Sequence, residues 1–227
     1  MACATRGAQV LLTDQDLRGL EESCDAVEAA GGPAPGYCQL DLAVAGPDAF
    51  DELLKSFNDA YGDLHGLVHC AAHFRGLQPM EQVTPDEWLT SMQVNLNAAW
   101  LLSVICLPSL KASQSGRLVF VLADEGVCGS PFWGAYGAAN AALEALAQMF
   151  AEELEDSGCS AFGVRTGPMR THLRATAYLG EHPSTVPEPR HAAERIAALL
   201  LDPVDGQAAI QDLSEKQVRP HERPQNR

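Results

Sequence analysis

The chain alternates short apolar runs with longer segments in which apolar residues recur every three or four positions. The short runs have the length of strands, and the longer segments have the period of amphipathic helices. This alternation predicts a parallel sheet with right-handed crossovers and helices on both faces. Strands are expected at residues 8–13, 37–42, 66–72, 116–122, 160–166 and 206–210, and helices at 16–30, 47–61, 84–110, 136–156 and 191–201.

Several expected helices carry recognisable end signals. Gly31 and Gly32 follow the first helix, and Pro47 opens the second, where its missing N–H costs nothing. Thr84 and Glu87 have the spacing of a capping box at the start of the third. These signals fix where the amphipathic segments begin and end.

The chain has 227 residues, enough for one sizeable α/β domain. We expect this single domain at residues 1–213, followed by a flexible charged tail at 214–227. No apolar run has the length needed to span a bilayer, and the first residues show no signal-peptide pattern, so no membrane partner is expected. The net charge of −15 argues against nucleic acid, whose phosphates require clustered basic residues.

The chain contains seven cysteines, an odd number, and no CxxC pair. Most of them lie in apolar stretches, where a free thiol behaves as a small hydrophobic side chain. This pattern favours a reducing cytoplasmic location over a framework of disulfides.

Ligands of a doubly wound parallel sheet bind beyond the carboxyl ends of its strands, and two such ends carry acids. Asp14 could accept a hydrogen bond from a ribose 2′-OH and repel a 2′-phosphate, which would favour NAD over NADP. Equally, Asp14 or Asp16 could cap the following helix. Asp41 could reach an adenine edge, although spacing alone favours a plain turn residue.

The expected strand 66–72 ends near residues that suggest metal or thiol chemistry. His65 and His69 would lie roughly 13 Å apart in a strand, too far to share a metal ion, so a core or supporting histidine is favoured. Cys70 has no identifiable activating base, and a buried structural thiol is the favoured interpretation. HExxH is also absent from the chain, so no metal site is expected.

The segment YGAAN places Tyr136 near the start of a long helix, with Asn140 four residues later. A basic residue at the latter position would make a proton-transfer pair, because a cation lowers the tyrosine pKa from its reference value near 10. Asn140 is neutral and cannot do this. Asp124 and Glu125 end the preceding strand, and their negative charge is expected to raise the Tyr136 pKa.

The ordered segments RGAQVLLTD, LDL, LHGLVHCAA, WLTSMQVNLNAAW, GRLVFVLADEG, YGAAN and GPMRT run from about residue 6 to residue 210. In this order they resemble the short-chain dehydrogenase/reductase family, and most closely its YciK-like bacterial branch. The resemblance implies a Rossmann-like doubly wound parallel sheet. It also implies hydride transfer between NAD(P) and a small-molecule carbonyl or alcohol.

The resemblance assigns roles to individual positions of this chain. Tyr136 matches the family's general acid/base, and Asn95 matches the asparagine that anchors a water relay. The family's dimers imply a homo-oligomer through helices 84–110 and 136–156. The positions that match cofactor contacts are Asp14, Asp41, Leu42, Ala71, Asn140 and Thr171.

The chain departs from the family pattern at the same site. Asn140 replaces the catalytic lysine, Ala123 replaces the catalytic serine, and Ala72 replaces a glycine beside the cofactor. The family's first strand and its glycine-rich phosphate loop are missing. That strand would lie between residues 8–13 and 66–72, so the sheet should have a gap there or those two strands should pair directly.

These departures predict a family member with lost or strongly reduced catalysis and weak or absent NAD(P) binding. The alternative is an active NAD(P)-dependent oxidoreductase whose true start lies upstream of Met1. A hydrolase on the same kind of sheet is disfavoured, since GxSxG is absent.

Overall fold

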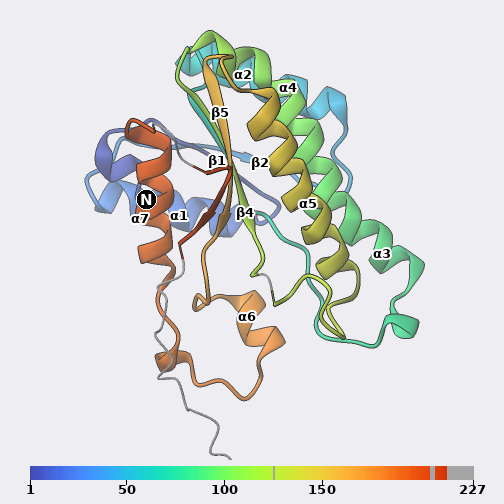
Figure 1. The fold of residues 1–227 in the computed structure, drawn as a ribbon. Helices are drawn as coiled ribbons and strands as arrows, with labels where there is room; N and C mark the ends of the chain where they lie inside the picture. The colour runs from blue at the N-terminus through green and yellow to red at the C-terminus, as the bar shows by residue number, and fades with distance from the viewer. Residues whose placement is uncertain (125, 205–207, 214–227) are drawn as a thin grey trace, which may run out of the picture.

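The computed structural model describes residues 1–124, 126–204 and 208–213. Six parallel strands lie at the centre of the molecule, with helices on both sides (Figure 1). The predicted α/β architecture is therefore confirmed. The strands are β1 (Leu11–Asp14), β2 (Gly36–Gln39), β3 (Gly66–His69), β4 (Gly116–Leu122), β5 (Cys159–Arg165) and β6 (Ile210–Asp212).

The strands form two ladders instead of one continuous sheet. β1 pairs only with β2, while β3, β4, β5 and β6 form a four-stranded sheet in that order. Within the described residues, β1 and β3 are not hydrogen-bonded to each other. Of the two expected outcomes, a gap and a direct pairing, the structure has the gap. It falls where the strand order reverses, which is the ligand-binding crevice of an open α/β sheet.

Most helices occur where the sequence predicts them, with two exceptions. The expected helix 84–110 is divided by a π-helical turn at Gln93–Asn97, and the short helix α6 was not foreseen. The α-helices are α1 (Leu17–Ala29), α2 (Pro47–Tyr61), α3 (Pro85–Met92), α4 (Ala98–Ala112), α5 (Gly134–Glu153), α6 (His172–Ala177) and α7 (Pro189–Leu201). Short 3₁₀ turns occur at Ala4–Arg6, Met80–Gln82 and Pro183–Thr185.

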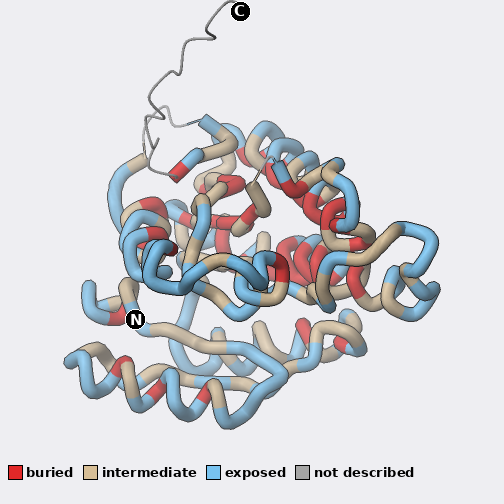
Figure 2. The backbone as a smooth tube through the Cα atoms, turned by 90° about the horizontal axis from the view of Figure 1, so that it is seen from below, coloured by how far each residue is buried: buried red, intermediate tan, exposed pale blue. Residues whose placement is uncertain are grey.

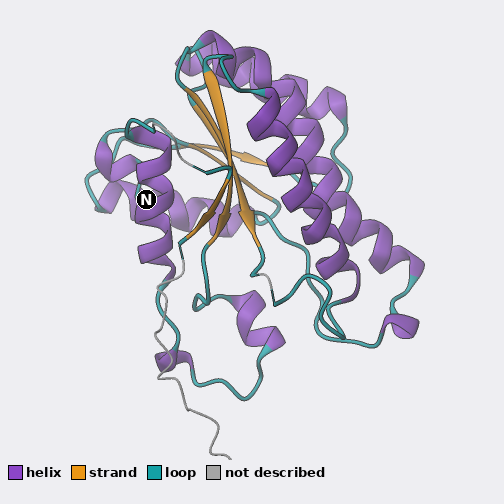
Figure 3. Cartoon of the chain, in the orientation of Figure 1, coloured by secondary structure: helices purple, strands orange, loops and turns teal. Residues whose placement is uncertain are grey.

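Helices α2, α4 and α5 cover one side of the strands, and α1 and α7 lie on the other (Figure 3). Successive side chains of β4 point to opposite faces, as the pleat requires. Phe120 belongs to the core cluster shared with α4 and α5, whereas Val119 packs with Leu199 of α7. Burial on both faces explains the continuous apolar run of β4.

Burial is concentrated around the four-stranded sheet (Figure 2). Five of the seven residues of β4 are buried, but none of β1, β2 or β3 is. A strand beside a gap lacks a neighbour on one edge, which leaves its residues partly exposed. The strands on both sides of the ligand-binding crevice are therefore less buried than β4.

The N-termini of α1 and α3 can be compared with the capping residues that the sequence predicts. Asp16 is the N-cap of α1, and its side chain accepts a hydrogen bond from the Arg18 N–H. Thr84 caps α3 through the Glu87 N–H at 3.2 Å, as predicted. The Glu87 carboxylate, however, contacts Nε2 of His73 at 3.1 Å.

By length and composition alone, the helical stretch Pro85–Ala112 could cross a membrane, whereas the sequence analysis expected no such segment. The stretch has a mean hydropathy of 1.3. Its side chains Leu102, Cys106 and Leu110 are buried in the main core cluster. Packing within this chain therefore accounts for part of the apolar composition of α4.

The predicted tail at residues 214–227 lies outside the described residues, as do Glu125 and residues 205–207. The strand expected at 206–210 thus overlaps a segment that the structure does not describe. Its described part is β6, which begins at Ile210.

Candidate active site

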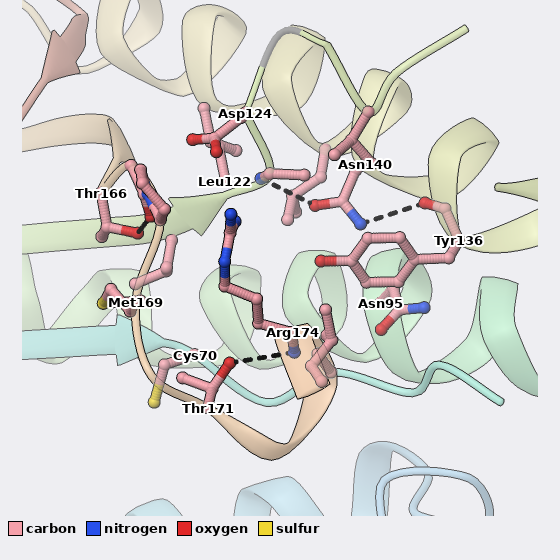
Figure 4. Close-up of a pocket in the computed structure, with 18 of the residues that line it drawn as sticks. Cys70, Asn95, Leu122, Asp124, Tyr136, Asn140, Thr166, Met169, Thr171 and Arg174 are labelled. Atoms are coloured by element: carbon pink, nitrogen blue, oxygen red, sulfur yellow. Dashed lines mark hydrogen bonds between the residues drawn. The ribbon is translucent and has the colours of Figure 1, made fainter. Parts of the chain in front are cut away.

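A cavity of about 260 Å³ lies at the carboxyl ends of β3, β4 and β5 (Figure 4). It brings together five of the predicted site residues from distant parts of the chain. They are Ala71, Asn95, Tyr136, Asn140 and Thr171. Cys70, Ala72 and Ala123 line the same cavity, so the positions that depart from the family pattern face one site.

Tyr136 lies in the first turn of α5, and its ring packs against Phe74 and Trp133 at centroid distances of 5.2 and 5.8 Å. Burial, and to a smaller extent the nearby Cys128, raise its pKa to about 12. Asp124 also raises this pKa, as predicted, although it contributes less than either burial or Cys128. The phenol is therefore held in its protonated form at neutral pH.

Asn140 is 5% exposed and connects α5 to the end of β4. Its Oδ1 accepts a hydrogen bond from the Ala123 N–H at 3.1 Å, and its Nδ2 donates to the Tyr136 carbonyl at 3.0 Å (Figure 4). The amide thus satisfies two backbone groups beside the cavity. This position does not supply the cation that the family uses to lower the tyrosine pKa.

Asn95 lies in the π-helical turn and is buried. Its Oδ1 accepts from the His73 N–H at 2.7 Å, and its Nδ2 donates to the His73 carbonyl at 2.9 Å and to Ser91 Oγ at 2.9 Å. Single-turn π-bulges occur often at functional sites, where they displace a side chain from its regular direction. Here the displaced amide fixes the chain that leaves β3 and forms one wall of the cavity.

Asn95→Ala is expected to lower the free energy of unfolding by about 2 kcal/mol, because it leaves the His73 backbone groups without partners. Urea unfolding followed by circular dichroism measures the change. Asn97→Ala is the matched control, since Asn97 is an exposed residue of the same turn whose amide contacts only Gln93. An equal effect of both substitutions would contradict the role assigned to Asn95.

Thr171 lines the cavity and also caps α6, where its Oγ1 accepts a hydrogen bond from the Arg174 N–H at 3.2 Å. Arg174, which was not predicted as a site residue, reaches the same cavity. In the segment that follows, Tyr178 lines the cavity and Glu181 binds Arg174. The short helix α6 offered no periodic signal from which these contacts could be inferred.

Asp14, Asp41 and Leu42 are not among the residues that line this cavity. Asp14 is exposed at the end of β1, and its Oδ1 accepts from the Asp16 N–H at 2.9 Å. Asp41 accepts from the Ala43 N–H at 2.9 Å, which is the turn interpretation. The Leu42 carbonyl accepts from Gln93 at 3.4 Å. Contacts of these residues with a cofactor remain predictions.

Cys70 is an exposed residue of the cavity wall, so the prediction that it is buried was wrong. The gap beside β3 explains the difference, because none of the described strands covers this edge. Desolvation of the thiol, and then the Asp14 carboxylate, raise the Cys70 pKa. A raised pKa reduces the thiolate fraction, which still argues against a nucleophilic role.

His69 is a supporting residue, as the sequence favoured. Its Nε2 contacts Ser103 Oγ at 2.8 Å, and its ring stacks on Phe120 at 5.0 Å. Burial lowers its pKa to about 4. The described residues contain no group of three or more potential metal ligands.

Comparison with curated proteins places this chain among oxidoreductases. A family model of short chain dehydrogenases matches residues 1–181. The uncharacterized oxidoreductase YciK of Escherichia coli K12 is 31% identical over 192 residues, which cover 83% of this chain and 75% of YciK. A short-chain type dehydrogenase/reductase of Picea abies is 27% identical, with coverage of 75% and 65%.

Solved structures give the same assignment. A short chain dehydrogenase from Salmonella enterica serovar Typhi superposes with a TM-score of 0.87 at 26% identity, covering 94% of this chain and 90% of that one. The E. coli YciK structure gives 0.85 at 28% identity, with 92% and 87% covered. A protein of E. coli CFT073 complexed with NADPH gives 0.87 at 28% identity, with 94% and 90% covered. The chain therefore belongs to the short-chain dehydrogenase/reductase family.

Proposed function

We propose that this chain is a member of the family in which carbonyl/alcohol redox chemistry is lost or strongly reduced, while the small-molecule cavity persists. The observation that supports the proposal is the raised pKa of Tyr136 together with the lack of a cation at position 140. Its phenol has a pKa of about 12, and the residue four positions on is a neutral amide already hydrogen-bonded to two backbone groups.

These features are expected to reduce the rate of carbonyl reduction strongly. General acid–base catalysis typically contributes roughly 10²–10⁴-fold to a rate, and a tyrosine with a raised pKa is a poor base at neutral pH. Ala123 has no hydroxyl to stabilise an oxygen that gains negative charge, which removes a further contribution of roughly 10²–10³-fold. Both losses act at the same reacting centre.

We infer that NAD(P) binding is weak. The cavity residues Tyr136, Asn95 and Thr171 fit the nicotinamide end of the family cofactor, and Asp14 at the end of β1 fits a ribose hydroxyl better than a phosphate. The pyrophosphate, in contrast, would lie in the crevice between β1 and β3, where a glycine-rich loop and its helix normally supply backbone N–H groups. The described residues provide no strand or loop of this kind there.

Calorimetry with NADH and NADPH tests the cofactor part of this proposal. We expect dissociation constants weaker than about 1 mM, the range left when most phosphate contacts are missing. Asp14→Ala is the matched variant, and it should reduce any preference for NADH. Clear micromolar binding of either cofactor would contradict the inference.

The alternative function is an active NAD(P)-dependent oxidoreductase, and two relatives of known structure favour it because they were solved with NADP and NADPH. Turnover of a panel of ketones and aldehydes distinguishes the two functions. We expect no turnover above background. Activity that disappears in Tyr136→Phe would establish the alternative.

We also propose that the protein forms a homodimer through α4 and α5. Trp100 and Val104 of α4 are exposed, as are Ala141 and Met149 of α5. The two helices lie side by side on one face of the sheet (Figure 1), so these side chains lie on neighbouring helices of that layer.

The seven free cysteines support a further part of the proposal, a reducing, cytoplasmic location.

Trp100→Glu is expected to convert the dimer to a monomer, because a charge in the centre of an apolar interface costs several kcal/mol. Analytical ultracentrifugation measures the mass in solution. Val44→Glu is the control, since Val44 is exposed on the loop between β2 and α2. A monomeric wild type, or a dimer that survives Trp100→Glu, would disprove this interface.

A further inference from the structure

Arg174 is the only lysine or arginine among the described residues that line the cavity. It projects from α6 into the pocket, with Asp124 and Thr171 around it (Figure 4). Its side chain is 21% exposed, so the guanidinium is partly withdrawn from water. The chain has a net charge of −15, so a positively charged side chain directed into this cavity requires an explanation.

The guanidinium is engaged by a carboxylate of this chain. Nε contacts Glu181 Oε2 at 2.5 Å and Nη2 contacts Oε1 at 2.8 Å, which is the two-pronged arrangement that arginine forms with any carboxylate. The guanidinium carbon also lies 4.5 Å from the ring centroid of Tyr178. Nη1 has no hydrogen-bond partner within the described part of the chain.

Glu181 lies in the connection that follows α6. Leu179, two residues before it, is 90% exposed. The Arg174–Glu181 pair is partly solvated, with 21% and 30% of the two side chains exposed, and it lies outside the core clusters. An incoming carboxylate could therefore replace Glu181 on the same guanidinium without disturbing the core.

The other walls of the cavity indicate what the remainder of the ligand would be. Trp133, Leu143 and Leu173 present apolar surface to the same space as Arg174. Asp124 is the second carboxylate near the guanidinium, and burial raises its pKa while Arg174 lowers it. A ligand with one anionic end and an apolar body matches this distribution.

We propose that the cavity binds a small carboxylate with an apolar body, that Arg174 receives the carboxylate group, and that Glu181 is its internal competitor. The inference rests on the proposed function of this cavity as a small-molecule site, and it gives the chemical class of the ligand. A purely structural Arg174–Glu181 pair would tie α6 to the following loop and would show no ligand dependence.

Binding of benzoate and of its neutral analogue benzamide tests the proposal, by NMR titration of the full chain without any nicotinamide cofactor. We expect benzoate to bind at least about tenfold more tightly than benzamide, given a charge-assisted two-pronged contact. Glu181→Gln should tighten benzoate binding several-fold, because it removes the competing charge. Arg174→Gln should abolish the preference, and Arg174→Lys should retain only part of it.

Glu194→Gln is the control, because Glu194 forms an exposed pair with Arg190 on α7. It should leave benzoate binding unchanged. Equal affinities for benzoate and benzamide, or no gain in Glu181→Gln while the protein remains folded by circular dichroism, would overturn the proposal. Because no cofactor is present, neither result depends on whether NAD(P) binds or turns over.

Discussion

Asn140→Lys is expected to lower the free energy of unfolding by about 3 kcal/mol and to leave carbonyl turnover at background. The substitution restores the lysine of the family pattern, so the sequence alone suggests a gain of function. In the structure, however, it removes the acceptor of the Ala123 N–H and the donor to the Tyr136 carbonyl. It also introduces an ammonium group at a buried position.

Urea unfolding and turnover of a ketone panel with NADPH measure the two outcomes. Ala29→Lys is the control, because Ala29 is exposed at the end of α1, on the opposite side of the strands from α4 and α5 (Figure 1), and should tolerate the change. A rise in turnover in Asn140→Lys would show that the lysine was the one missing component. We expect a gain only when Ala123→Ser and a phosphate-binding loop accompany it.

The free energy of unfolding is expected to fall by about 3 kcal/mol as the pH decreases from 6.5 to 4, because of His69. Its pKa is lowered from 6.5 to about 4 in the folded protein by burial. In that range the unfolded chain binds a proton that the folded chain excludes. This contribution to stability is therefore complete above pH 6.5 and is lost as the pH falls through the folded pKa.

Urea midpoints at pH 7.5 and pH 4.5 measure the loss, and His69→Gln should remove most of the difference between them. Gln can retain a hydrogen bond to Ser103, which contacts the imidazole at 2.8 Å. His191→Gln is the control, since His191 is an exposed residue of α7. An undiminished pH effect in His69→Gln would assign the acid sensitivity to other groups.

The sequence by itself determined most of the secondary structure and the family. β4 and α2 have the predicted bounds Gly116–Leu122 and Pro47–Tyr61. Apolar periodicity and capping residues act over a few positions, so they can be interpreted without the fold. The ordered motifs likewise indicated which positions face the site, and the cavity collects Asn95, Tyr136 and Thr171.

Only the tertiary structure decided what those positions do. Whether β1 and β3 would pair directly or leave a gap depended on how the two ladders pack, and Cys70 lies exposed at the end of β3. Asn140 could have faced a ribose, but its partners Ala123 and Tyr136 are fixed by the contact between α5 and β4. The residues around Arg174 in the sequence did not indicate that it belongs to the site. Its charge matters there only because the tertiary structure brings α6 over the carboxyl ends of the strands.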